Sequence, residues 1–165
     1  MQLLERLEAH LSDAGCEPGV IAHCRTVNTV AAGYARSPVV DRTLLTTGAM
    51  LHDLGRSRTH SLHHAEVGAD LARQSGCPDK VARIIQRHIG AGLTVEECAL
   101  LGLIPRDSVP ERLEEQIVAH ADNLVKGTRA ITPEERMDRS LFLGRKFILR
   151  AFRLNLDLEP LRHLR

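Results

Sequence analysis

Apolar residues recur at helical spacing along almost the whole chain of 165 residues. Within residues 18–36, for example, Val20, Val27 and Val30 follow the period of one helix face. We find no run in which apolar and polar residues alternate, the pattern typical of a strand. Glycine and proline divide the sequence into helical segments, at positions where helices end or begin. The sequence therefore predicts an all-α fold, a compact bundle of seven or eight helices.

The length favours one domain with a short appendage. Helices are predicted at approximately residues 2–14, 18–36, 41–54, 64–74, 78–90, 94–102 and 110–126, and a last one begins at residue 133. We expect the domain to span residues 1–132. Residues 133–165 carry eight Lys or Arg against five Asp or Glu and are apolar on more than one face. We expect them to form a helical extension that packs on the domain or mediates a homodimer.

Charge and composition narrow the possible partners. The formal net charge is +1 and aromatic residues make up 2% of the chain, so neither a basic surface nor base-stacking platforms for nucleic acid are expected. The first 15 residues lack the apolar stretch of a signal peptide or a membrane span. None of the four cysteines forms a Cys-x-x-Cys pair, and reduced thiols are the simplest interpretation. We expect a cytoplasmic protein without membrane association.

Six side chains of metal-ligand types interrupt or border the apolar helix faces. They are His23, His52, Asp53, His64, His88 and Asp122. His23 follows Val20 by three residues, and Asp122 lies between Val118 and Val125. A single core-facing histidine is usually satisfied by its neighbours, but burying six such groups without partners would cost several kcal/mol each. A bound divalent cation would remove that cost for all six at once.

The ordered set resembles the HD superfamily of metal-dependent phosphohydrolases, which is named for its His-Asp pair. The resemblance covers roughly residues 18–127. It is carried by His23 and by the segments HDLGR (52–56), HHAEVGA (63–69), RHIG (87–90) and AHADN (119–123). Two histidines, His64 and His88, fall where the dinuclear members of the superfamily have additional ligands. The pattern is therefore closer to that subset, and compact archaeal HD proteins are also similar.

The resemblance implies two divalent transition-metal ions, with Asp53 as the bridging, catalytic carboxylate. The first ion would be held by His23, His52, Asp53 and Asp122, and the second by Asp53, His64 and His88. Iron or manganese is favoured, because four imidazoles argue against Mg²⁺ and Ca²⁺. Two metal ions can acidify a bridging water and clamp phosphoryl oxygens during in-line attack. His63 adjoins His64, and either could be the ligand, although His64 fits the helix phase better.

The implied activity is hydrolysis of a phosphate ester or phosphoanhydride in a small nucleotide-like substrate. A phosphomonoesterase, a 2′,3′-cyclic phosphodiesterase and a dinucleoside-polyphosphate hydrolase remain open alternatives. An alternative of another class is a non-catalytic nucleotide-binding HD module, which would be expected to have lost some of the six ligand positions. Arg56, Arg58 and Lys126 are candidates for binding substrate phosphate, since an arginine can hold a phosphate through two N–H groups.

Overall fold

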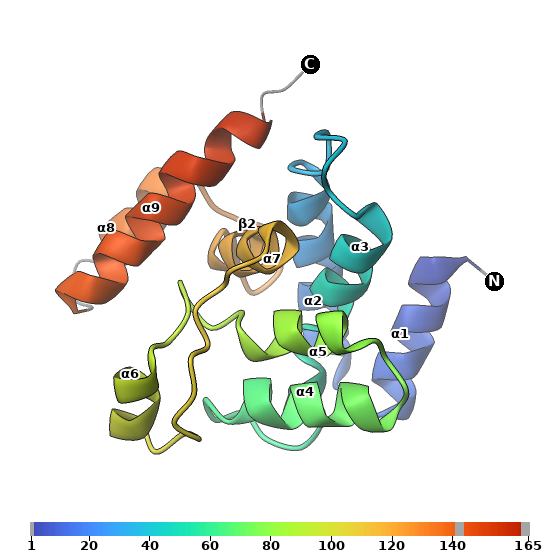
Figure 1. Ribbon diagram of the computed structural model, residues 1–165. Coiled ribbons are helices and arrows are strands. Elements are labelled where there is room, and N and C mark those ends of the chain that lie inside the picture. The colour runs from blue at the N-terminus through green and yellow to red at the C-terminus, as the bar shows by residue number, and fades with distance from the viewer. Residues whose placement is uncertain (1, 141–143, 163–165) are drawn as a thin grey trace.

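The computed structural model describes residues 2–140 and 144–162, which form the predominantly helical fold that the sequence predicts (Figure 1). The elements in chain order are α1 (Leu3–Asp13), α2 (Pro18–Ala32), α3 (Arg42–Leu51), the 3₁₀ helix η1 (Leu54–Ser57), α4 (His64–Gln74), α5 (Asp79–Gln86), α6 (Val95–Leu100), α7 (Leu113–Asn123), the strands β1 (Val125–Lys126) and β2 (Arg129–Ala130), α8 (Pro133–Ser140) and α9 (Arg145–Arg162). The all-α prediction is confirmed. The small antiparallel ribbon of β1 and β2 is an addition that the sequence pattern did not indicate.

Helix α7 lies at the centre of the fold and contacts α2, α3, α5 and α9 (Figure 1). Its Ile117, Val118 and Ala121 are fully buried, because side chains three or four residues apart project from the same side of a helix. Burial of an aliphatic side chain of this size stabilises the fold by about 1.5–3 kcal/mol. The packing therefore fixes the register of α7 and, with it, the position of Asp122.

The backbones of η1 and α4 touch at Gly55. A Cβ on Gly55 would meet the carbonyl oxygen of His64 at 1.9 Å and the backbone nitrogen of Gly68 at 2.6 Å. The sequence predicts that Gly55 ends the preceding helix, but α3 ends earlier, at Leu51, and the φ angle of Gly55 is not positive. Glycine is needed here for close approach rather than for a left-handed turn. That approach brings the end of α3 beside the start of α4.

Helices α5 and α7 also end earlier than the sequence predicts, and this changes where two candidate site residues lie. Helix α5 ends at Gln86, so His88 lies in the turn that follows it. Helix α7 ends at Asn123, so Lys126 belongs to β1 rather than to the last turn of a helix. Gly127, with a φ of +61°, closes the turn between the two strands. Both side chains are thus presented from connections between helices, where the 3.6-residue period no longer applies.

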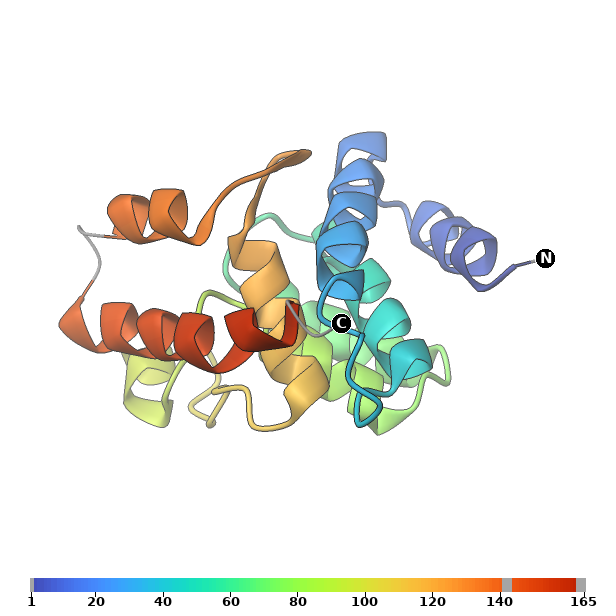
Figure 2. The same ribbon diagram turned by 90° about the horizontal axis from the view of Figure 1, so that it is seen from above.

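The C-terminal segment contains two helices instead of the single helix that the sequence predicts, and residues 141–143 between them lie outside the described range. Helices α8 and α9 lie side by side (Figure 2). Ala151, Leu154 and Leu158 of α9 are buried in the same core cluster as α7. The boundary at residue 132 and a homodimer through this segment stay predictions. Within residues 2–140 and 144–162, no helix has both the length and the apolar character needed to cross a bilayer.

Candidate metal centre

The structure brings the six candidate ligands together from five segments of the chain. They are His23 in α2, His52 and Asp53 at the end of α3, His64 at the start of α4, His88 after α5, and Asp122 in α7. Ligand atoms of His23, His52 and Asp122 all lie within 4.8 Å of one another, and so do those of His52, Asp53 and His88. The two triads share His52 and form one continuous cluster.

All four imidazoles of this cluster are oriented by a hydrogen bond to the backbone. Nδ1 of His23, His52, His64 and His88 lies 2.6, 2.7, 2.7 and 2.6 Å from the carbonyl oxygens of Gly127, Ala49, Ser61 and Ile85, respectively. A carbonyl oxygen can only accept, so Nδ1 carries the proton in each ring. When such a ring is neutral, its lone pair is therefore on Nε2, as in histidines that bind a metal through that atom.

Asp53 uses its two oxygens on different sides of the cluster. Its Oδ1 lies 3.2 Å from Nε2 of His64 and 3.6 Å from Nε2 of His88, whereas its Oδ2 lies 3.7 Å from Nε2 of His52. Burial disfavours the charged carboxylate, but these imidazoles, His52 first, hold the pKa of Asp53 well below its usual range. Asp53 is therefore ionised at neutral pH. Its two oxygens lie near different imidazoles, so each could bind a cation at a different position in the cluster.

Asp122 is the second carboxylate and lies nearer to the solvent. Its Oδ1 is 3.0 Å from Nε2 of His23 and 3.6 Å from Nε2 of His52. Although burial opposes ionisation, the neighbouring imidazoles of His23 and His52 hold the pKa of Asp122 well below its usual range. With 22% of its side chain exposed, Asp122 lies where the cluster opens toward the surface.

The cluster contains buried acceptors that its own donors do not satisfy. Among the described residues, His52 Nε2 and Asp53 Oδ1 are buried and have no hydrogen bond. Burial lowers the pKa of His88, which favours its neutral, metal-binding form. An unsatisfied buried polar atom costs about 1–3 kcal/mol. Cations bound by these atoms would remove that cost for both of them. Imidazole and carboxylate donors in this proportion fit a divalent transition metal.

An open cleft of about 340 Å³ borders the cluster and connects it to the surface. The charged and imidazole side chains in its lining are Arg56, His64, His88, Asp122, Lys126, Arg136 and Arg139. Among these described lining residues, Asp122 is the only carboxylate against four basic side chains. A cleft with this charge attracts an anionic ligand.

Two of the three predicted phosphate-binding residues reach this cleft. Arg56 Nε lies 2.7 Å from Oδ2 of Asp53, and Lys126 lines the cleft from β1. Arg58 is placed elsewhere, because its Nη1 donates to the carbonyl oxygen of Ala14 at 2.9 Å. That carbonyl belongs to the C-terminal end of α1, whose partial negative charge attracts a guanidinium. Arg58 is therefore not part of the candidate site.

The structure also separates the neighbouring histidines. His64 is buried within the cluster, whereas His63 is half-exposed and its Nδ1 lies 3.2 Å from a carboxylate oxygen of Glu66. His120 is buried away from the cluster and hydrogen-bonded to Glu159. Only His64 of these three histidines meets the other candidate ligands.

Arg136 and Arg139 were missed by the sequence analysis. They lie on α8, and they reach the cleft only because the chain returns to it after β2. Arginines on an amphipathic helix ordinarily belong to a solvated face. Nothing in the local pattern distinguishes these two from other surface arginines.

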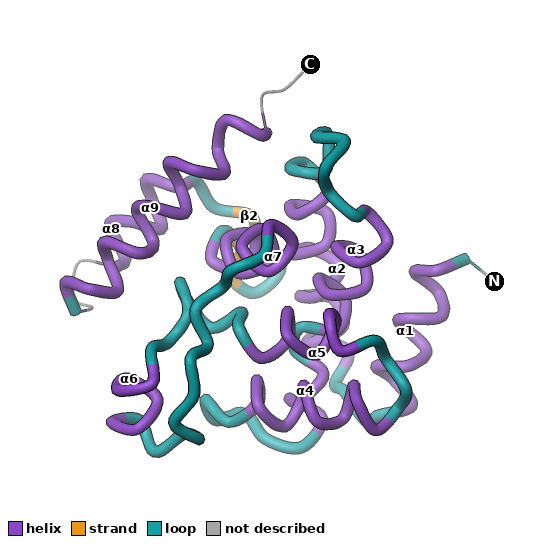
Figure 3. The backbone as a smooth tube through the Cα atoms, in the orientation of Figure 1, coloured by secondary structure: helices purple, strands orange, loops and turns teal. Residues whose placement is uncertain are grey.

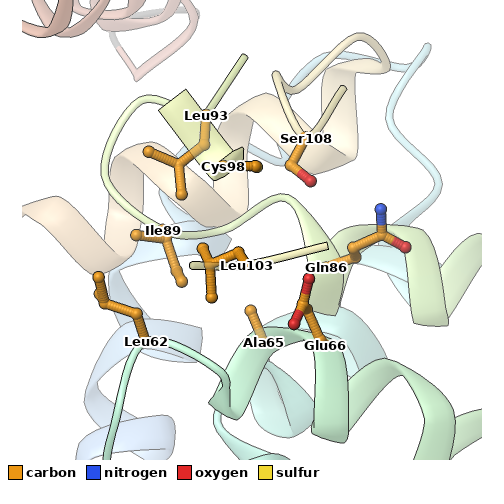
Figure 4. A pocket seen from close by; sticks show the side chains of 9 residues that line it. All are labelled: Leu62, Ala65, Glu66, Gln86, Ile89, Leu93, Cys98, Leu103 and Ser108. Atoms are coloured by element: carbon orange, nitrogen blue, oxygen red, sulfur yellow. The ribbon is translucent and has the colours of Figure 1, made fainter. Parts of the chain in front are cut away.

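Packed side chains close one wall of the cleft. Leu62 and Ile89 line both the cleft and a recess of about 10 Å³ behind it, which Leu103 helps to fill (Figure 4). A recess of this size holds one water molecule at most. The loop between α6 and α7 (Figure 3) supplies Ser108, which also lines the recess and exchanges two backbone hydrogen bonds with Leu93. This wall of the cleft is therefore closed to a ligand.

Comparisons with known proteins identify related chains. Residues 20–127 match the HD domain family. Uncharacterized protein MJ0778 of Methanocaldococcus jannaschii is 41% identical over 154 residues, which are 88% of this chain and 91% of that protein. The tRNA (cytidine(56)-2'-O)-methyltransferase of Picrophilus torridus is 46% identical over 120 residues, which are 73% of this chain. The match covers 35% of the methyltransferase, so this chain corresponds to about a third of it.

A solved structure shares the fold. The HD domain of the L. monocytogenes phosphodiesterase PgpH, in complex with Cyclic-di-AMP, aligns with a TM-score of 0.53 over 90% of this chain and 93% of that one. The two sequences are 17% identical. At this low identity, the comparison shows only that the two domains share the arrangement of their helices.

Proposed function

This chain belongs to the HD domain family, and on that premise we propose that it is a metal-dependent phosphohydrolase acting on a small nucleotide-like substrate. One observation carries the proposal. Four imidazoles, each oriented through Nδ1, direct Nε2 toward two ionised carboxylates in a buried cluster beside a basic cleft. A structural metal site would be closed by its protein ligands, whereas this cluster adjoins an open cleft.

The proposed cofactor is a pair of divalent transition-metal ions, iron or manganese. His23, His52, Asp53 and Asp122 would hold the first ion, and Asp53, His64 and His88 the second. The bridging role of Asp53 is supported by its two oxygens, which face different imidazoles of the cluster. When bound, such a pair supplies Lewis-acid stabilisation of phosphoryl oxygens and a hydroxide nucleophile near neutral pH.

The residues of the chain itself orient the ligands and the substrate. The backbone carbonyls fix the four rings, so little reorganisation is needed when the centre is loaded. Arg56 holds Oδ2 of Asp53 through Nε, donates from Nη1 to the carbonyl oxygen of His60 at 3.5 Å, and also lines the cleft. Its Nη2 is the donor that we assign to a phosphoryl oxygen. Lys126 adds positive charge at the cleft edge. These contacts would hold the scissile phosphate against the cluster.

A phosphodiester is the substrate class that we favour. The PgpH HD domain, which shares the fold, is described as a phosphodiesterase domain and was solved with Cyclic-di-AMP. A 2′,3′-cyclic phosphodiester and a dinucleoside polyphosphate are the alternatives within the same chemistry. A module that binds a nucleotide without hydrolysing it is the alternative of another class.

Anaerobic hydrolysis assays test the proposal. Metal-stripped protein is reloaded with Mn²⁺ or Fe²⁺ and offered bis(4-nitrophenyl) phosphate, 2′,3′-cyclic AMP, cyclic-di-AMP and a diadenosine polyphosphate. We expect turnover of at least one phosphodiester, its loss in Asp53→Asn with an unchanged helical spectrum, and wild-type activity in Asp13→Asn, which alters an exposed aspartate of α1. Nucleotide binding by the loaded protein without any turnover would favour the non-catalytic module.

A further inference from the structure

His88 is the candidate metal ligand with the least support from regular secondary structure. It lies in the turn after α5, whereas each of the other five candidate ligands lies in a helix or directly borders one. The turn continues through Gly90 and Gly92, whose φ angles of +58° and +87° belong to the left-handed region. Contacts from other elements therefore contribute to fixing the position of His88.

Helix α7 supplies the first of these contacts. Nδ2 of Asn123, the residue after Asp122, donates to the carbonyl oxygen of Gly90 at 2.8 Å. Under the proposed function, Asp122 binds the first metal ion and His88 the second. This hydrogen bond therefore joins the two backbone segments that carry ligands of different ions, and the turn cannot shift along α7 without breaking it.

Helix α9 supplies two further contacts. The connection from α5 to α6 extends toward α9 (Figure 1), and the Phe147 ring packs so closely on Gly90 that a Cβ on the glycine would overlap it. Nη2 of Arg150 donates to the carbonyl oxygen of Gly92 at 3.1 Å and lies 2.7 Å from Oε2 of Glu97. Phe147 and Arg150 are three residues apart and project from one side of α9. The helix therefore contacts both ends of the segment between Gly90 and Glu97.

Helix α9 is itself anchored in the core. Ala151 and Leu154 are buried in the same cluster as Ile117 and Ala121 of α7. The turn that carries His88 is thus held between two helices that also pack on each other. Outer contacts that orient a metal ligand matter for binding, because their removal lowers metal affinity by about 10–100-fold.

We propose that Asn123, Phe147 and Arg150 are positioning residues for the second metal position, and that α9 is needed for its full affinity. These side chains act through His88, by fixing the turn that carries it. The inference rests on the proposed function for the presence of a second ion at His88. It adds a dependence that the six ligands alone do not predict, since contacts in the C-terminal segment would control the binding of one ion and not of the other.

The test is an anaerobic titration of the metal-stripped full chain with Mn²⁺, followed by calorimetry. We expect two binding events in the wild type, and the event that is missing in His88→Ala identifies the second ion. Asn123→Ala, Phe147→Ala and Arg150→Ala should each raise the dissociation constant of that ion by about tenfold or more, with little change for the first ion. Arg150→Lys should keep part of the affinity, because one charged donor remains.

Two matched controls lie on the same helix. Phe152→Ala and Arg153→Ala remove side chains of the same types that are exposed on α9, and both variants should bind two ions as the wild type does. Electron paramagnetic resonance supplies a second readout. At a Mn²⁺ concentration that fills both positions of the wild type, the signal of a coupled ion pair should be replaced in Arg150→Ala by that of a single ion, a change that a general loss of stability would not produce.

The outcomes separate this inference from the proposed function. Selective loss of the second ion in the variants, without hydrolysis in any sample, would support the positioning role and contradict the proposed function. Hydrolysis by a wild type with two ions, together with unchanged affinities in the variants, would overturn the positioning role and leave the proposed function standing. Equal weakening of both ions would also overturn it, because the contacts would then stabilise the domain as a whole, and so would a wild type that binds one ion.

Discussion

Nε2 of His64 lies 3.1 Å from Nε2 of His88, although each ring already donates from Nδ1 to a backbone carbonyl. Two neutral rings in this arrangement would direct lone pairs at each other. Such a contact is unfavourable unless a proton or a metal ion lies between the two nitrogens. Oδ1 of Asp53 lies near both atoms and adds a third acceptor. The pair therefore indicates where a second cation would bind.

Replacing either member of this pair should remove one metal ion. We expect the wild type, purified and handled without oxygen, to contain close to two transition-metal equivalents per chain, and His64→Ala or His88→Ala close to one. His63→Ala is the matched control, because His63 is half-exposed and paired with Glu66, and it should retain two. Elemental analysis by mass spectrometry measures the ratio. One equivalent in the wild type would contradict the assignment of His64 and His88.

Removing the metal should lower the stability of the whole domain. A ligand present at 100 times its dissociation constant stabilises the native state by about 2.7 kcal/mol, and here it also compensates the buried acceptors of His52 and Asp53. Excess chelator should therefore lower the Tm measured by differential scanning calorimetry, and added Mn²⁺ should restore it. Asp53→Ala should respond much less to either addition. Equal Tm values for chelated and loaded wild type would refute a metal held by this cluster.

Arg56 and Arg58 are two residues apart and should behave differently. Arg56 contacts Asp53 and lines the cleft, so Arg56→Ala should lower kcat/KM for the best phosphodiester by roughly tenfold or more, since charge-assisted hydrogen bonds to phosphate are lost. Arg58 is bound to the end of α1, so Arg58→Ala should leave kcat/KM near the wild-type value. Equal losses in the two variants would show that the effect is not specific to the cleft.

Much of the candidate site could be predicted, because polar side chains of metal-ligand types stand out among the apolar positions of a buried helix face. His23 and Asp122 occupy positions of an apolar stripe, where burial without a partner is costly, so periodicity alone points to them. His88 was expected on a helix, but the structure has it in a turn after α5, where its Nδ1 can reach the carbonyl of Ile85. Periodicity finds the buried face and does not determine the residue at which a helix ends.

The cationic side chains were harder to predict, because a charge at the surface leaves no mark in the apolar pattern. Arg58 follows the His-Asp pair closely in sequence, yet it turns toward α1. Arg136 is distant in sequence and reaches the cleft through the path of the chain after β2. Which arginine faces the cleft is decided by how the elements pack, and that information is not local.

Glu159 of α9 should stabilise the attachment of the C-terminal segment. Its Oε1 accepts hydrogen bonds from Tyr34 at 2.6 Å and His120 at 2.9 Å, and both donors are buried. Glu159→Ala would leave two buried groups without this acceptor and should cost about 2–4 kcal/mol in the free energy of unfolding. Glu159→Gln retains an acceptor and should cost less. Urea denaturation of the two variants measures the difference, and equal stabilities would contradict this role.

The same contact predicts a pH dependence. Burial disfavours the charge on Glu159, but hydrogen bonds from His120 and Tyr34 lower its folded-state pKa below the ordinary value of 4.5. The stabilisation is therefore fully present above pH 4.5 and is lost as the pH falls through the folded-state pKa. Between pH 6 and pH 3.5, metal-free wild type should lose more stability than Glu159→Gln. Parallel stability curves for the two proteins would contradict the prediction.

Gly55 should tolerate no side chain, because its backbone lies against that of α4. A Cβ there would meet the carbonyl oxygen of His64 at 1.9 Å, and a backbone atom cannot move aside by a change of rotamer. Gly55→Ala should therefore destabilise the protein by more than about 3 kcal/mol, or displace α4 and lower the metal content. Gly19→Ala is the control, since a Cβ on this exposed helical glycine meets nothing within 4 Å and should stabilise α2 by up to about 1 kcal/mol. Urea denaturation and metal analysis of both variants decide between these outcomes, and a Gly55→Ala protein as stable and as metal-loaded as the wild type would show that η1 and α4 need not touch for the cluster to form.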